Sequence, residues 1–87
     1  MHNVTHIPDL FVFRIEGDKG QEPAHLDYEL LDQHSVNFTH TYVPFRQRGK
    51  GHAEALVKAG LEWAKANQLT IHTRCWYVEK YMAEHSE

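Results

Sequence analysis

Basic residues and glycines alternate over six positions that read RGKGHA, from Arg48 to Ala53. Glycines adopt left-handed conformations and let the backbone approach a ligand closely. The residues that follow have helical spacing, and the N–H groups at a helix start attract anions. Arginine and lysine add full charges that suit phosphate. We therefore predict a phosphate or pyrophosphate site formed by Arg48, Gly49, Lys50, Gly51, His52 and Ala53.

A tight turn with solvated basic side chains is the alternative interpretation of so short a motif. Two common nucleotide-binding loops are excluded by residue type. A P-loop requires Ser or Thr directly after its lysine, whereas Gly51 follows Lys50. A dinucleotide-binding fingerprint that begins at Gly49 requires Gly or Ala at position 54, which is Glu54.

Cys75 is one candidate for group-transfer chemistry. It stands between a predicted strand and a predicted helix, and a helix N-terminus stabilises a thiolate. The neighbouring Arg74 would act in the same direction. Cys75 could then serve as a nucleophile or only line a cleft. A small buried apolar residue is the third interpretation.

His40 is the second candidate, because the ordinary pKa of histidine, near ~6.5, suits a general base. A partly buried structural histidine is the alternative. The alternation of the segment predicts that His40 shares one face with Val36, Phe38 and Tyr42. The pattern leaves open whether that face also holds Cys75.

The hydrophobic spacing predicts the elements that position these residues. We expect strands over residues 10–16, 24–31, 36–43 and 69–75, with Phe11 and Leu30 on core-facing sides. A long helix is expected from Gly49 to about Asn67, a short final helix over residues 76–85, and a doubtful extra strand near Val4. The order β-β-β-α-β-α predicts a mixed central sheet in an α/β (α+β) fold. Strands that flank the long helix within one sheet would be parallel.

Composition limits the classes of function. The 87 residues, 41% of them hydrophobic, predict a single domain over residues 1–87, as a monomer or weak homodimer. A net charge of −3 disfavours nucleic-acid binding. One cysteine, no membrane-length apolar run and no signal-peptide pattern predict a cytoplasmic protein without membrane contact. The eight histidines lack zinc-site spacing, so no metal is expected, and His2 and His6 are assigned to a frayed terminus.

RGKGHA matches the Q/R-x-x-G-x-G/A signature of the GNAT N-acetyltransferases. The stretches HTYVPFRQRGKGHAEALVKAGLEWAKANQL and TRCWYVEKYMAEH resemble small single-domain members of that family. The resemblance implies a compact GNAT-like acyl-CoA N-acyltransferase fold that binds acetyl-coenzyme A. It places the pantetheine arm along Thr41, Tyr42 and Val43, in a cleft where this strand separates from the next. It also makes Cys75 a functional residue. The segment Pro44 to Gln47 departs from the family pattern and makes the loop more basic.

The resemblance thus implies an acetyl-CoA-dependent N-acetyltransferase, with Cys75 and His40 near the transferred acetyl group. Larger members cover the acceptor side with N-terminal helices that this chain has no room for, so a protein or peptide amine is a candidate acceptor. Tyr77 and Tyr81 are expected to be core aromatics; the alternative is that a tyrosine early in the last helix protonates the departing thiolate. The alternative function is a non-catalytic acyl-CoA-binding or sensing module. A general anion-binding domain is the third hypothesis.

Overall fold

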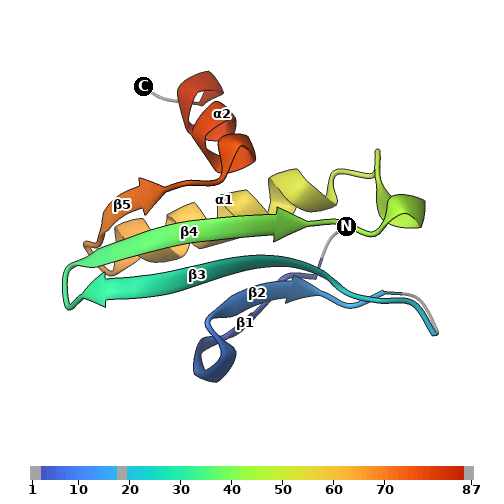
Figure 1. Cartoon of the computed structure of the whole chain (residues 1–87), viewed down its shortest axis with the longest axis horizontal. Coiled ribbons are helices and arrows are strands. Elements are labelled where there is room, and N and C mark those ends of the chain that lie inside the picture. Colours follow the sequence, from blue (N-terminus) through green and yellow to red (C-terminus); the bar gives the residue numbers. More distant parts are fainter. Residues whose placement is uncertain (1–2, 18–19, 86–87) are drawn as a thin grey trace.

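A computed structural model describes residues 3–17 and 20–85, in which five strands form one sheet. The strands are β1 (Thr5–Ile7), β2 (Val12–Ile15), β3 (Ala24–Asp32), β4 (Ser35–Tyr42) and β5 (Thr70–Thr73). Strands β1 to β4 are antiparallel in chain order, and β5 pairs in parallel with β4 (Figure 1). The mixed sheet is confirmed, and the doubtful N-terminal strand exists as its edge.

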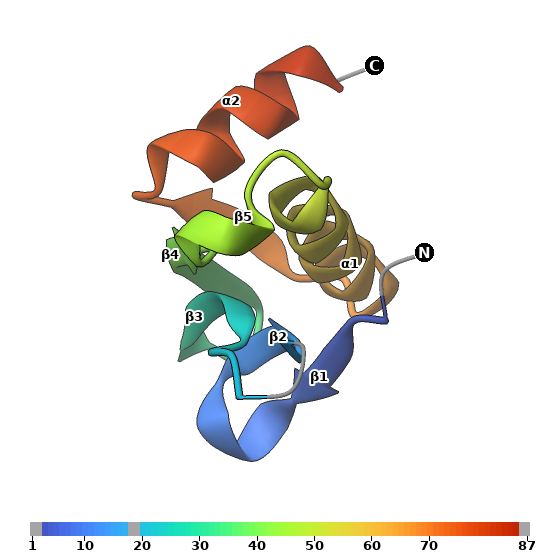
Figure 2. The same ribbon diagram turned by 90° about the vertical axis from the view of Figure 1, so that its right-hand side faces the viewer.

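Helix α1 (His52–Ala66) connects β4 to β5 and lies along one face of the sheet (Figure 2). An apolar stripe of α1 packs against the sheet, with Leu56, Val57 and Ala64 buried in the core. Gly60 belongs to the same stripe, and a Cβ there would lie only 2.9 Å from Leu26 Cδ2. The close approach of helix and sheet therefore requires glycine at this position. The second helix, α2 (Trp76–Glu84), lies at the β5 end of the sheet.

Two expected boundaries and one expected core position are corrected. Helix α1 begins at His52 rather than Gly49, because Gly49 and Gly51 have positive φ angles of 79° and 81° that interrupt a right-handed helix. Strand β2 begins after Phe11, whose φ of 54° ends a short 3₁₀ turn and leaves the ring exposed. Leu30 is also exposed, close to the β3–β4 turn.

Strand β4 contains an irregularity that changes which face its side chains occupy. Phe38 pairs with Tyr28, whereas His40 pairs with Asp27, so Thr39 is an extra residue in the ladder. Tyr28 is buried on the α1 side, so the adjacent Asp27 points to the opposite face. His40 and Tyr42 therefore lie on the face away from α1, and the expectation that they share the face of Val36 and Phe38 was wrong. We call this face, opposite α1, the outer face.

His6 also differs from the expectation of a frayed terminus; His2 lies outside the described residues. The His6 ring stacks on Phe13 at 4.2 Å and meets the edge of Trp63 at 4.9 Å between ring centroids. Its Nε2 lies 2.6 Å from the hydroxyl of Tyr28. His6 therefore attaches β1 to the aromatic part of the core.

Burial lowers the pKa of His6, because the apolar surroundings disfavour the charged imidazolium. The unfolded chain then binds the proton more readily than the folded chain does. Stability should fall as the pH drops below the ordinary histidine pKa of ~6.5, and this loss should stop below the folded-state pKa.

We expect the free energy of unfolding to decrease between about pH 7.5 and about pH 5.5, and to decrease less in His6→Phe. Urea denaturation of both proteins across this range measures the difference. An identical pH dependence of the two proteins would contradict the role of His6.

Candidate functional site

A cavity of about 700 Å³ opens where β4 and β5 separate. The two strands pair only from Ser35 to Phe38 and from Thr70 to Thr73. Beyond that point the N–H of Arg74 still donates to the carbonyl of Phe38 at 3.2 Å, and the chain then turns into α2. The last residues of β4 have no strand beside them on this edge, so their backbone groups face the cavity.

The cavity brings together all but one of the residues that the sequence predicted for the site. Its lining includes His40, Thr41, Tyr42, Val43, Arg48, Gly49, Gly51, His52, Ala53 and Cys75. Lys50 is exposed and does not line the cavity. Further lining residues are Thr39, Gln47, Glu54, Arg74, Trp76 and Tyr77.

The glycine loop, residues 48–51, leads into α1 and leaves open space beside its backbone. Gly51 occupies the N-cap position, and no side chain caps the helix. The N–H groups of the first helical turn therefore have no acceptor within the helix. A Cβ at Gly49 would meet nothing within 4 Å, so space is open beside this backbone.

Arg48 ties the loop to the end of β4. Its Nε donates to the carbonyl of Val43 at 2.9 Å, and its guanidinium lies 5.9 Å from the centre of the Phe45 ring. Arg48 therefore has a structural role, in addition to the charge that it brings to the loop.

Gln47 is a buried residue of the cavity wall that sequence reasoning missed. Its side chain is 5% exposed, and its Nε2 donates to Gln21 Oε1 and to the carbonyl of Glu22. Among the described residues its Oε1 has no hydrogen-bond partner. Gln47 thus anchors the glycine loop to the β2–β3 connection. No periodicity marks a single buried amide in a loop.

Cys75 is the N-cap residue of α2, and its side chain lies in the core-side wall of the cavity. Its Sγ is 3.4 Å from the hydroxyl of Thr41. Burial alone would raise the pKa of the thiol. Hydrogen bonds from the Thr41 hydroxyl and from the N–H groups of Val78, Tyr77 and Thr41 outweigh burial and lower the pKa. These hydrogen bonds therefore stabilise the Cys75 thiolate relative to that of an ordinary cysteine.

His40 and Cys75 lie on opposite sides of β4. Leu26, a core residue, pairs with Thr41, so Thr41 and its Cys75 contact are on the α1 side. His40 is exposed on the outer face, yet both residues line the same cavity. The cavity therefore passes the unpaired edge of β4 and is reached from both faces of the sheet.

Tyr77 follows Cys75 by two positions and lines the cavity. Burial and the nearby carboxylate of Glu54 raise its pKa, so the hydroxyl keeps its proton at neutral pH. Tyr81 has a raised pKa for the same two reasons but does not line this cavity. Both rings also pack against the core.

Two further findings concern the described residues as a whole. Across residues 3–17 and 20–85 no group of three or more histidine, cysteine or acidic residues is arranged to hold a metal ion. Within the same ranges, no helix combines the length and the apolar character that crossing a bilayer requires.

Helix α1 follows a splayed β4 with a glycine loop at its start, and this arrangement defines the fold of an acyl-CoA N-acyltransferase. The solution structure of a GCN5-like protein from Staphylococcus aureus shares the fold, with a TM-score of 0.68 at 24% identity. The match covers 94% of this chain and 78% of that one. The family model of GCN5-related N-acetyl-transferases matches residues 11–87. The chain therefore belongs to the GCN5-related N-acetyltransferase (GNAT) family.

Similar curated proteins carry the name Protein NATD1. The chicken (Gallus gallus) and human (Homo sapiens) proteins are each 38% identical over 74 residues. These matches cover 85% of this chain and 66% and 64% of the two relatives. The mouse (Mus musculus) protein is 41% identical over 61 residues, which are 70% of this chain and 56% of the relative. The chain thus spans slightly less than two thirds of the chicken and human relatives.

We expect Thr41→Val to raise the pKa of Cys75, because the substitution removes a hydrogen bond that stabilises the thiolate. Cys75 is the one cysteine of the chain, so the rate of alkylation by iodoacetamide against pH reports its titration directly. Thr41→Ser should retain the wild-type profile, and Thr70→Val controls for loss of a hydroxyl elsewhere. Superimposable profiles for Thr41→Val and wild type would show that the Thr41 contact does not tune the thiol.

Proposed function

We propose that this protein is an acetyl-CoA-dependent N-acetyltransferase that acts on an amine acceptor, with protein or peptide amines as candidates. The observation that carries the proposal is the shared cavity. The glycine loop at the α1 N-terminus, the free edge of β4 and the Cys75 thiol all open into it. The helix start suits the pyrophosphate of an acyl-coenzyme A, and the free strand edge suits its pantetheine arm. The Cys75 sulfur would then lie near its thioester.

The residues present fit the coenzyme. The N–H groups of the first turn of α1, approached through the left-handed Gly49 and Gly51, would bind the pyrophosphate. Thr41, Tyr42 and Val43, at the free edge of β4, would hold the pantetheine amides by backbone hydrogen bonds. Acetyl-coenzyme A supplies an acetyl thioester, and the same cavity extends to Cys75.

Two chemical routes are available to this site. In the first, the Cys75 thiolate attacks the acetyl carbonyl, the new carbon–sulfur bond forms, and the bond to the coenzyme sulfur breaks. Tyr77 donates a proton to the departing thiolate. The amine, after losing a proton to His40, then displaces Cys75 and forms the amide. In the second route the amine attacks the thioester directly and Cys75 only lines the cavity.

A non-catalytic acyl-CoA-binding module is the second candidate function. One observation favours it: His40 and Cys75 occupy opposite sides of β4, and the structure records no contact between them. Such a module needs the loop and the β4 edge but neither of these side chains. Incubation with labelled acetyl-CoA and a set of amines separates the two functions, because a binding module would show only slow hydrolysis.

The domain boundaries, oligomeric state, location and partners of the protein remain predictions from its sequence. We expect one domain over residues 1–87, a monomer or weak homodimer, and a cytoplasmic location without nucleic-acid or membrane partners. Lys50 belongs to the proposed loop by sequence, as a charge near the phosphates rather than as part of the cavity wall.

Gly49→Ala should weaken coenzyme A binding at least about tenfold, because its methyl group would occupy the space in which the phosphates are proposed to lie. Gly20→Ala is a matched control. Gly20 has the same φ of 79° and the same open surroundings, but it lies outside the cavity.

Both variants should lose a similar, small amount of stability, about 1 kcal/mol, from the strained φ. Titration calorimetry with coenzyme A gives the affinities. Equal affinities in Gly49→Ala and Gly20→Ala would remove the loop from the proposed site.

Cys75→Ala should reduce acetyl transfer by about a hundredfold or more if Cys75 is the nucleophile, while coenzyme A binding changes by less than about twofold. Wild-type protein incubated with acetyl-CoA should also gain one acetyl group at Cys75, detected by mass spectrometry of the peptide. Full turnover in Cys75→Ala would favour the direct route and leave the binding site intact.

A further inference from the structure

The outer face beside His40 carries a polar cluster, of which His25 and Asp27 lie outside the proposed coenzyme site. His25 and Asp27 of β3 pair there with Tyr42 and His40 of β4. The Nδ1 of His25 lies 2.9 Å from Asp27 Oδ1. The His25 ring centre is 6.2 Å from that of His40 and 5.4 Å from that of Tyr42. These four side chains form what we call the outer cluster.

The outer cluster adjoins the cavity that holds Cys75. His40 and Tyr42 line this cavity from the outer face, whereas Thr41 and Cys75 line it from the α1 side. The coenzyme loop is also at the start of α1. A second substrate can therefore reach the same cavity from the outer face without crossing the coenzyme.

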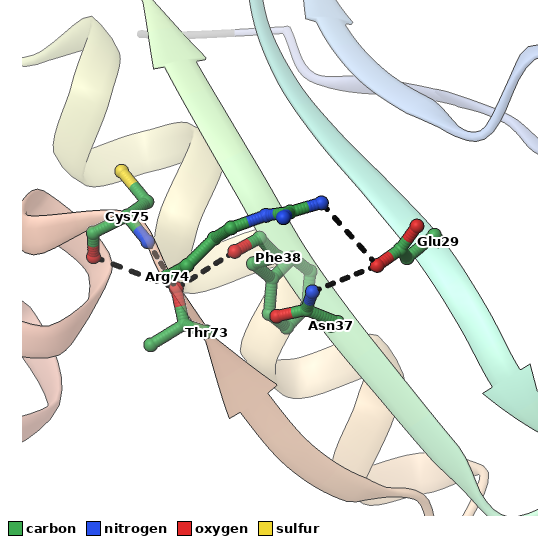
Figure 3. Close-up of polar contacts among 6 residues, drawn as sticks. All are labelled: Glu29, Asn37, Phe38, Thr73, Arg74 and Cys75. Atoms are coloured by element: carbon green, nitrogen blue, oxygen red, sulfur yellow. Dashed lines mark hydrogen bonds and ion pairs between the residues drawn. The ribbon is translucent and has the colours of Figure 1, made fainter.

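Among the described residues, the recorded arginine ion pairs of the outer face do not include Asp27. Arg74 extends across β4 to Glu29 at 3.5 Å, with its guanidinium directed away from the Cys75 sulfur (Figure 3). Arg14, which pairs with His25 across β2 and β3, reaches Glu16 at 3.6 Å. The recorded partner of Asp27 is the titratable His25.

A second carboxylate borders the cluster. The hydroxyl of Tyr42 donates to Glu22 Oε2 at 3.2 Å, and this hydrogen bond and the carboxylate charge raise the pKa of Tyr42. The Glu22 side chain thus borders the outer cluster. The Arg48 guanidinium acts on Tyr42 in the opposite direction, so Asp27 and Glu22 are the groups here that could attract a cation.

We propose that the outer cluster receives the acceptor as a positively charged ammonium group, which Asp27 binds and from which His40 takes a proton. The neutral amine then attacks the acetyl carbonyl, and the released coenzyme thiol carries a proton away. His25 is a positioning residue that orients the Asp27 carboxylate. This inference rests on the proposed acetyl transfer. It adds the class of acceptor, which is an amine that carries a second positive group rather than a negative one.

The test uses two amines of similar length, cadaverine with a second ammonium group and aminovalerate with a carboxylate. Each is titrated into the coenzyme A-loaded protein while the imidazole NMR signals of His25 and His40 are followed. We expect cadaverine to shift these signals and to bind about twofold to fivefold more tightly than aminovalerate, the range of one exposed ion pair. The preference should weaken as salt is added.

Asp27→Asn should abolish the preference for cadaverine. Asp32→Asn is the matched control, because Asp32 lies in the same strand about 17 Å farther along, and it should keep the preference. A preference that survives Asp27→Asn, or equal or absent responses to the two amines in wild type, would overturn the inference.

The backbone signals of residues 48–53 in the same spectra test the coenzyme site separately. A loop response to coenzyme A without a cadaverine response would overturn only the acceptor inference. A cadaverine response in a protein that ignores coenzyme A would overturn the proposed function.

Discussion

The site depends on the point at which β5 leaves β4. The carbonyl of Phe38 holds this point by accepting the Thr73 hydroxyl at 2.8 Å and the Arg74 N–H at 3.2 Å. Thr73 also accepts the N–H of Cys75 at 3.0 Å, so the same residue sets the start of α2 (Figure 3). One side chain thus ends the strand pairing, positions the N-cap cysteine and leaves the edge of β4 open.

The extra residue in β4 gives the open edge two different sides. In a regular ladder Thr39 would pair with Asp27 and His40 with Leu26, so His40 would face α1 and the core. With the extra residue, Thr41 reaches the Cys75 thiol on one side while His40 joins Asp27 on the other. The unpaired edge of β4 thus presents the Cys75 contact on one side and His40 on the other.

Much of the fold could be predicted from the sequence, because alternation and helical spacing report burial directly. The apolar stripe of α1 and the strands around Phe13 and Phe38 follow from that spacing. Phe11 was assigned to the wrong side because an alternating sequence pattern does not reveal that one of its residues has a left-handed backbone conformation. The face of His40 was misassigned for a related reason, since a bulge shifts the period by one residue. The loop from Arg48 to Ala53 was found by residue type, whereas the Gln47 anchor depends on distant Gln21 and Glu22, which no local pattern connects to it.

The central claim is that one cavity binds acetyl-coenzyme A from the α1 N-terminus to Cys75. Mapping of backbone amide chemical shifts during titration with acetyl-coenzyme A tests it most directly. The account predicts saturable shifts in three separate segments, residues 39–43, 48–53 and 75–78, and little change in the β1–β2 region. Shifts confined to residues 48–53 would show an anion site without a coenzyme cleft, and the absence of saturable shifts would contradict the account.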